Sequence, residues 1–405
     1  MKIFLVSVNI INYPFYAYPV GMSVVANILQ SEGHSVKQFD FLAEAMSFES
    51  FAKQLDLFKP DIVGISIRNA DPDSIENAKK ITSISKEKKY TVIAGGTALG
   101  CYNDLFQKTG ADFGFIGPAE SNLINFINNF KKGILPDTKI INFNNYEKVF
   151  GPLYDKNILN FYAQKEYAVS INTKRGCKYS CFDCVYPYLD GKVCRYREID
   201  DIIEDFKLLE KYNVKNLFFS DSIVNDDNIF FIKLLKKMTE SKININWSGY
   251  LRPEHLNDEV ICLLKESGLK TPIVNVDAST DQTLLGMQKG FTWQDVINVD
   301  NLFVKHKISC DPKISSRASF VFGGPMETKE TVLEGIQNIK NLHFTNFDIL
   351  TFEPFATSAS INYEPSSVDK KWMEQELIKA FGSVKNCRLP IKTTLASELK
   401  RMKNA

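Results

Sequence analysis

The sequence predicts an α/β protein with two parallel-sheet domains and a short helical tail. Its 405 residues exceed the size of one ordinary domain. Strand-like and helix-like segments alternate through the first third of the chain, which predicts a doubly wound parallel sheet. A second alternating series follows, and its six strand candidates over roughly 190 residues predict a (β/α)6 partial TIM barrel.

The first domain is expected to cover residues 1–135. Its predicted strands are residues 2–8, 36–41, 61–66, 90–94 and 111–116, and its predicted helices are residues 22–31, 43–58, 73–88 and 121–131. Doubly wound sheets bind their ligands beyond the carboxyl ends of the strands. The loops expected to carry function are therefore residues 9–21, 67–72, 95–100 and 117–120.

Residues 136–165 show no clear periodicity and are rich in Asn, Lys and Asp, which indicates a linker. The barrel is expected to cover residues 166–365. Its predicted strands are residues 167–171, 216–220, 243–249, 271–276, 318–322 and 348–352. The remaining residues, 366–405, are charged and predicted to be mostly helical.

Composition and charge argue against several partners. Lys plus Arg number 49 and Asp plus Glu 48, so neither nucleic acid nor an anionic membrane is expected as the main partner. The sequence contains no stretch of about 18 apolar residues, so no membrane span is expected. The opening MKIFLVSVNI lacks the cleavage site of a secretory signal peptide. Three of the eight cysteines are crowded and the others are scattered, which is typical of a reduced, cytoplasmic protein.

The segment RGCKYSCFDCVYP carries the clearest chemical signal. It places Cys177, Cys181 and Cys184 with three and then two residues between them, just after a predicted strand. Thiolates hold iron–sulfur clusters, usually through four ligands per cubane, so three cysteines leave one iron open. The alternatives are chance clustering of the cysteines and a zinc site. Zinc prefers four protein ligands, but His306 and His343 are distant in sequence.

This motif resembles that of the radical S-adenosylmethionine superfamily, whose [4Fe–4S] cluster binds S-adenosylmethionine at the open iron and cleaves it to a 5′-deoxyadenosyl radical. The segments FFSDSI, WSGYLRP, VNVDASTDQTLLGMQKG and FGGPMET resemble later motifs of the same barrel; they are residues 218–223, 247–253, 274–290 and 322–328. The resemblance implies that the residues contacting S-adenosylmethionine are Phe182, Asp221, Ser248, Arg252 and Asp277.

The first domain resembles the Rossmann-like cobalamin-binding domain that precedes the barrel in class B members of this superfamily. The matching segments are PVG, GHSV, KPDIVG, AGGT and GPAE, at residues 19–21, 33–36, 59–64, 94–97 and 117–120. The resemblance implies that the residues contacting cobalamin are Tyr18, Gly21, Ser66, Arg68, Asn69, Gly95, Gly96, Thr97, Gly117 and Glu120.

Some cobalamin proteins supply an axial histidine through D-x-H-x-x-G. The corresponding stretch here reads YAYPVG, so we expect cobalt without a histidine ligand and with Tyr18 packed on its lower face. His34 follows a helix at the opposite end of the sheet, and we expect it on the surface. The alternative is a degenerate domain that keeps the fold without cobalamin.

Together the two resemblances imply a cobalamin-dependent radical enzyme, most simply a C-methyltransferase acting on an unactivated carbon of a small-molecule or natural-product substrate. Radical rearrangement, cyclisation or oxidation without methyl transfer is one alternative, and an iron–sulfur sensor or scaffold is another. The expected partners are the small-molecule substrate and an electron donor such as flavodoxin or ferredoxin, with no nucleic acid and no membrane span.

Overall fold

The computed structural model describes residues 1–12, 16–102, 104–120, 122–142, 148–166, 168–182, 184–352, 366–382 and 387–388. The chain divides into two compact units. Unit 1 comprises Met1–Lys178 and Val185–Asp221, and unit 2 comprises Tyr179–Cys184 and Ser222–Ala405.

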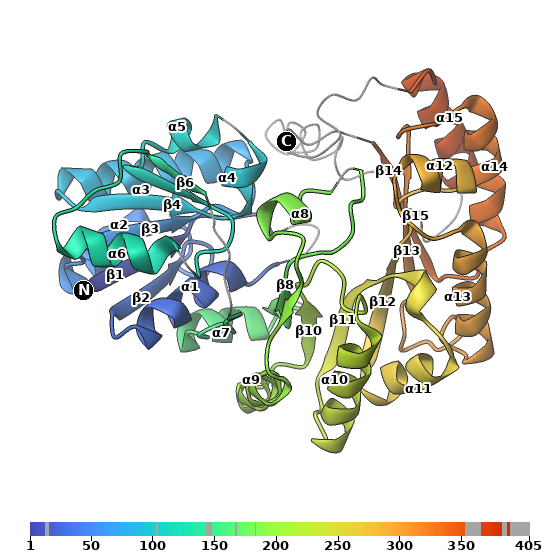
Figure 1. The fold of residues 1–405 in the computed structure, drawn as a ribbon, viewed down its shortest axis with the longest axis horizontal. Helices are drawn as coiled ribbons and strands as arrows, with labels where there is room; N and C mark the ends of the chain where they lie inside the picture. Colours follow the sequence, from blue (N-terminus) through green and yellow to red (C-terminus); the bar gives the residue numbers. More distant parts are fainter. Residues whose placement is uncertain are drawn as a thin grey trace. The chain divides into compact units, whose positions relative to one another are not determined.

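Unit 1 contains a parallel sheet with helices on both faces, as the sequence predicts (Figure 1). Its strand order is β2-β1-β3-β4-β5-β6. The strands are β1 (Lys2–Ser7), β2 (Ser35–Asp40), β3 (Ile62–Ser66), β4 (Thr91–Gly95), β5 (Phe113–Ile116) and β6 (Ile140–Asn142). The helices between them are α1 (Val20–Ser31), α2 (Phe48–Phe58), α3 (Pro72–Glu87), α4 (Thr97–Cys101), α5 (Leu105–Thr109) and α6 (Asn122–Lys131).

The order of the strands fixes where this sheet can bind a ligand. The chain moves from β1 to β2 on one side and then to β3 on the other, so the direction of winding changes between β1 and β3. A crevice for ligands forms at such a switch point, beyond the carboxyl ends of the two strands. Asn9 follows β1 and Ile67 follows β3, which places both at this crevice.

The core of the first sheet is apolar and rich in aromatic rings. Phe4, Phe39 and Phe51 are at most 1% exposed, and Phe4 packs edge-on against Phe51 with ring centroids 5.7 Å apart. The predicted helix at 43–58 begins later, at Phe48, because the side chain of Ser47 caps it by accepting a hydrogen bond from the backbone N–H of Ser50.

The segment predicted as a linker contributes regular structure to unit 1. Strand β6 pairs with β5 as an edge strand of the sheet, and α7 (Lys156–Ala163) begins at the capping carboxylate of Asp155. Unit 1 also holds the parallel pair β7 (Val169–Ile171) and β10 (Asn216–Phe219), helices α8 (Tyr186–Leu189) and α9 (Ile199–Lys211), and the antiparallel pair β8 (Lys174–Arg175) and β9 (Arg195–Tyr196).

Unit 2 continues the predicted β/α series. Its parallel strands run in the order β15-β14-β13-β12-β11. They are β11 (Asn246–Leu251), β12 (Leu269–Asn275), β13 (Arg317–Phe322), β14 (Asn346–Thr351) and β15 (Cys387–Arg388). The helices are α10 (Asn228–Glu240), η1 (Pro253–His255), α11 (Asp258–Glu266), α12 (Asp281–Gly286), α13 (Trp293–Lys305), α14 (Lys329–Lys340) and α15 (Lys370–Phe381). Helices α10, α11, α13 and α14 lie along the outside of the strands (Figure 1).

The six barrel strands expected from the sequence are all present, as β7 and β10 in unit 1 and β11 to β14 in unit 2. The sequence did not predict β15. Helix α15 confirms a helical segment in the tail; the rest of the tail after residue 382, apart from residues 387–388, lies outside the described residues.

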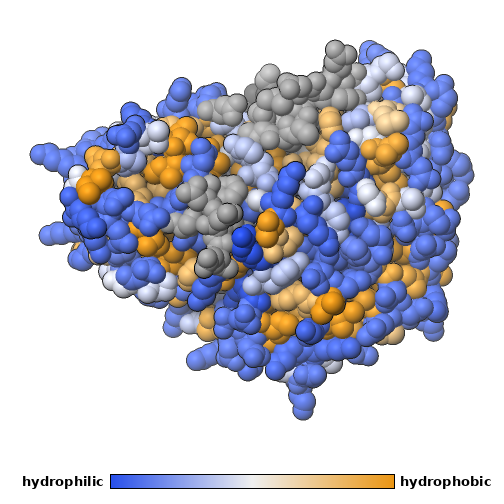
Figure 2. Space-filling model, viewed as in Figure 1, coloured by the Kyte–Doolittle hydropathy of each residue, from blue (hydrophilic) through white to orange (hydrophobic). Residues whose placement is uncertain are grey.

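The face drawn in Figure 2 is mostly hydrophilic, with hydrophobic residues in small groups. In the described part of the chain, no helix has the length and apolar character needed to cross a membrane.

Candidate cofactor sites

The switch point of the first sheet gathers three of the residues predicted to contact cobalamin. Ser66 ends β3, and its carbonyl accepts a hydrogen bond of 3.3 Å from the N–H of Val8. The side-chain oxygen of Asn9 accepts hydrogen bonds from the N–H groups of Arg68 (3.0 Å) and Asn69 (3.1 Å). Asn9 thus holds the loop after β3 against the end of β1, although the sequence analysis did not assign it a role.

The glycine pair at the end of β4, Gly95 and Gly96, lies beside the same loop. Gly96 has φ +106°, and a Cβ built there would lie 2.4 Å from the carbonyl oxygen of Ile67. The loop itself therefore requires glycine at this position, whether or not a ligand approaches it. A Cβ on Gly95 would meet only the ordinary contact of 3.8 Å with the carbonyl oxygen of Phe115. Thr97 begins α4 directly after the pair.

Two further glycines that are predicted to contact cobalamin are Gly21 and Gly117. Gly21 is in the first turn of α1, and among the described residues no atom beyond its chain neighbours and its own helix backbone lies within 4 Å of a Cβ built on it. Gly117 follows β5 with φ +88°. Both positions suit close approach of a large ring to the backbone, and their contact with cobalamin stays a prediction.

Tyr18 is packed inside unit 1. It is 2% exposed, its hydroxyl shares a hydrogen bond of 2.9 Å with Ser23, and its ring packs against Tyr154 and Tyr162 at 5.3 and 5.6 Å. Burial raises the pKa of Tyr18 well above its usual value. These contacts give the ring a structural role, and its place below a cobalt ion stays a prediction.

The expectation that His34 lies on the surface was wrong. The residue is 5% exposed, and its Nδ1 lies 3.4 Å from the amino group of Met1. Burial lowers the pKa of His34. Because Met1 precedes β1, this contact also places His34 at the amino end of the sheet, away from the carboxyl ends of the strands, as predicted.

Glu120 forms an ion pair inside unit 1. Its Oε1 accepts a hydrogen bond of 3.2 Å from Nε of Arg175, and its side chain is only 2% exposed. Arg175 also contacts Asp190 at 3.3 Å. Burial raises the pKa of Asp190, and the charge of Arg175 opposes that rise. The pair connects the predicted cobalamin loop after β5 to the strand that precedes Cys177.

Arg175→Met is expected to destabilise unit 1 by roughly 3–5 kcal/mol, because it leaves the carboxylate of Glu120 buried without its cation. Urea unfolding followed by circular dichroism measures the loss. The matched control is Lys207→Met, which breaks the exposed pair with Glu204 and should change stability by about 0.5 kcal/mol or less. Equal losses of stability in the two variants would show that the buried pair stabilises unit 1 no more than the exposed pair does.

Among the described residues, none of the three motif cysteines forms a disulfide. Cys177, in unit 1, is 5% exposed, and its N–H donates a 3.0 Å hydrogen bond to the carbonyl of Gly191. Cys181 and Cys184, in unit 2, are half-buried. Asp183, which lies between Cys181 and Cys184 in the sequence, is outside the described residues. Among the residues that the structure describes, no group of three or more His, Cys, Asp or Glu side chains is already arranged around a metal position.

Asp221 organises the segment that leads to Cys177. It is 3% exposed and accepts hydrogen bonds from the N–H of Thr173 (2.9 Å), the hydroxyl of Thr173 (2.7 Å) and the N–H of Lys174 (3.2 Å). Burial raises the pKa of Asp221, and the charge of Lys174 opposes the rise. Both carboxylate oxygens are engaged within unit 1, which supports a positioning role for this residue.

Arg252 is the central residue of the candidate site in unit 2. It is 2% exposed, its guanidinium lies 3.6 Å from the ring centre of Tyr179, and its Nη1 lies 4.0 Å from Sγ of Cys181. Asn225 holds its backbone in place by accepting from its N–H at 2.8 Å and donating to its carbonyl at 2.9 Å. The same guanidinium forms an ion pair with Glu254, whose Oε1 accepts from its Nε at 2.5 Å.

Asp277 and Lys289 extend this group of residues. Nη2 of Arg252 donates to the carbonyl of Lys289, whose ammonium pairs with Asp277 at 2.8 Å. Asp277 has φ +55° and also accepts a hydrogen bond from the hydroxyl of Ser319 at 2.8 Å. Lys289 was missed by the sequence analysis; its position before Gly290, within a matched motif, was the available signal.

Two predicted residues lie elsewhere in unit 2. The hydroxyl of Ser248 donates to the carbonyl of Thr271 at 2.7 Å and ties β11 to β12, which is a structural contact. Phe182 donates its N–H to the carbonyl of Met287 at 3.0 Å, and its ring lies 6.1 Å from that of Phe352. Three cysteines, a guanidinium beside one of them and a half-buried carboxylate fit a thiolate-bound cluster and the amino-acid end of S-adenosylmethionine.

Comparison with known proteins defines the class to which this chain belongs. Residues 6–127 match the B12 binding domain family and residues 171–339 match the Radical SAM superfamily. The chain belongs to the cobalamin-binding radical S-adenosylmethionine enzymes. The cofactors of these two domains are cobalamin, S-adenosylmethionine and a [4Fe–4S] cluster, which confirms the predicted set.

Three similar proteins illustrate the relationship. The uncharacterized methyltransferase PH0819 of Pyrococcus horikoshii is 25% identical, over 83% of this chain and 76% of its own. The ribosomal protein uS12 methylthiotransferase RimO of Trichodesmium erythraeum is 22% identical, over 76% of this chain and 70% of its own. The structure of the radical S-adenosylmethionine methyltransferase TsrM from Kitasatospora setae, with cobalamin and a [4Fe–4S] cluster, has a TM-score of 0.73 at 20% identity and covers 88% of this chain and 76% of that one.

Proposed function

We propose that this enzyme transfers a methyl group from S-adenosylmethionine to a carbon atom of a small-molecule substrate. The observation that carries the proposal is the presence of a B12 binding domain and a Radical SAM domain in one chain. Cobalamin supplies a carrier for a methyl group, and the cluster with S-adenosylmethionine supplies a radical able to activate a carbon–hydrogen bond. PH0819, which is named as a methyltransferase, is similar over 83% of this chain.

In this proposal the residues of the two units have distinct roles. Cys177, Cys181 and Cys184 bind the cluster. Arg252 lies beside Cys181 and orients the anionic end of S-adenosylmethionine, with Asp277 available to its amino group. On the first sheet, Ser66, Arg68, Asn69 and the loops bearing Gly21, Gly95, Gly96, Thr97, Gly117 and Glu120 form the edge that receives cobalamin.

Methyl-deuterated S-adenosylmethionine tests the function. The reconstituted enzyme, with flavodoxin or ferredoxin as the proposed electron donor, is incubated with fractions of a small-molecule extract. We expect a product that carries the deuterated methyl group, formed together with S-adenosylhomocysteine and 5′-deoxyadenosine. 5′-Deoxyadenosine with an unlabelled, altered substrate would instead indicate rearrangement, cyclisation or oxidation. A product gaining sulfur with the label would indicate methylthio transfer, and no turnover at all would favour a sensor.

A further inference from the structure

A cysteine, a histidine and an aspartate meet on the outer surface of unit 2, outside the cofactor sites. Asp258 and Cys262 are four residues apart on α11 and so lie on the same face of the helix. His306, at the C-terminus of α13, lies against both. Its Nε2 is 2.6 Å from Oδ1 of Asp258, and its Nδ1 is 3.9 Å from Sγ of Cys262.

The contact with Asp258 fixes the chemistry of the imidazole. A carboxylate oxygen at this distance accepts the proton of Nε2, which leaves the lone pair of Nδ1 directed at the thiol. Lys305 also binds Asp258, at 2.6 Å, and the hydrogen bonds from Lys305 and His306 lower the pKa of Asp258. Lys265 donates to the carbonyl of His306 at 2.9 Å and holds the end of α13 in place. The arrangement is that of a nucleophile, a base and a group that orients the base.

We propose that Cys262 is a reactive thiol that forms mixed disulfides with low-molecular-weight disulfides. His306 takes the thiol proton at Nδ1, and the Cys262 sulfur attacks one sulfur of the incoming disulfide. The new S–S bond forms as the old one breaks, and the departing thiolate takes up the proton. No further oxidant is consumed, because the incoming disulfide is itself the oxidant.

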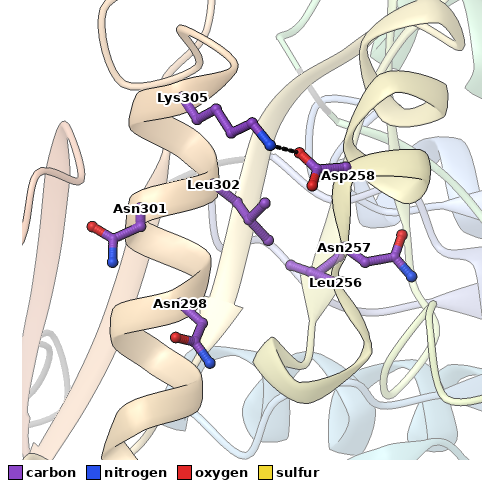
Figure 3. A pocket seen from close by; sticks show the side chains of 7 residues that line it. All are labelled: Leu256, Asn257, Asp258, Asn298, Asn301, Leu302 and Lys305. Atoms are coloured by element: carbon purple, nitrogen blue, oxygen red, sulfur yellow. Dashed lines mark hydrogen bonds and ion pairs between the residues drawn. The ribbon is translucent and has the colours of Figure 1, made fainter.

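A small pocket adjoins this group of residues and shares Asp258 and Lys305 with it. It has a volume of about 350 Å³ and lies between α13 and the start of α11. Figure 3 shows Lys305 reaching across to Asp258, with Leu302 directed toward Leu256 below them. The cations of Lys265 and Lys305 favour a disulfide that carries carboxylates, such as oxidised glutathione.

Cys310 is the internal control, because it is also an exposed free thiol. Within the described ranges, no histidine lies in hydrogen-bond reach of it, in contrast to Cys262. If solvent exposure alone set the reaction rate, the two thiols would react equally fast. Assistance from His306 would make Cys262 react faster.

The test uses the full-length, cluster-loaded enzyme under anaerobic conditions with oxidised glutathione, and peptide mass spectrometry reports the glutathione on each cysteine over time. We expect Cys262 to react about tenfold faster than Cys310. His306→Gln and Asp258→Asn should each bring Cys262 close to the rate of Cys310, while Cys310 itself and the iron content stay unchanged. Equal rates in the unmodified enzyme, or an unchanged Cys262 rate in both variants, would overturn the proposal. The measurement needs no methyl transfer, so its outcome is independent of the proposed function.

Discussion

Replacing Cys177, Cys181 and Cys184 together by Ala is expected to reduce the iron of the reconstituted protein from about four atoms per chain to background. The brown charge-transfer absorbance should disappear with it. The reason is that these thiolates are the proposed protein ligands of the cluster, and the motif offers no substitute for them. Iron analysis and the visible spectrum measure both effects.

A matched triple variant separates the motif from cysteines in general. Cys194, Cys262 and Cys310 are also three cysteines, lie outside the motif and form no disulfide among the described residues. Replacing them by Ala should leave the iron content and absorbance unchanged. Iron retained by the motif variant, or lost equally by both, would contradict the ligand assignment.

Asp221→Ala is expected to lower cluster loading strongly, even though Asp221 is not a ligand. The variant removes the acceptor of three hydrogen bonds, which the N–H and hydroxyl of Thr173 and the N–H of Lys174 donate. The loss of a hydrogen bond to a charged group costs about 1.5–3 kcal/mol. The backbone just before Cys177 should therefore no longer be held in one conformation. The iron content after reconstitution should fall together with thermal stability.

Asp221→Asn distinguishes this positioning role from direct contact with S-adenosylmethionine. The Asn oxygen can accept from both N–H groups, and its amide can donate to the hydroxyl of Thr173. A positioning role predicts near-normal iron and near-normal S-adenosylmethionine affinity for Asn. A direct charge-assisted contact predicts normal iron but affinity weakened by roughly 1.5–3 kcal/mol. The exposed residue Asp201, changed to Ala, serves as the surface control.

The fold could be predicted from the sequence because parallel strands buried on both faces leave continuous apolar runs between helices. The segment at 61–66, for example, becomes β3. Strand β6 was missed because it has three residues, two of them exposed, and gains its place only by pairing with β5. The same applies to β15, whose pairing with β14 is a long-range contact.

The candidate sites could be predicted in part. The cysteine motif is local, so its spacing is visible in the sequence, and Arg252 and Asp277 lie in recognisable segments. Lys289 and Asn225 could not be identified in the same way, because their roles depend on contacts with Arg252 across 37 and 27 residues. His34 was misplaced because a polar residue in a turn is usually exposed, whereas here it packs against the first residue of the chain.

The ion pair between Glu120 and Arg175 has a thermodynamic consequence. It joins the loop after β5, where cobalamin is proposed to bind, to a strand that ends two residues before Cys177. A ligand that binds the loop after β5 and strengthens or weakens this ion pair shifts the binding equilibrium of a ligand at Cys177. Such coupling is reciprocal. Cobalamin binding and cluster assembly would then change each other's affinity by the same factor. If an assembled cluster strengthens cobalamin binding, bound cobalamin strengthens cluster binding equally.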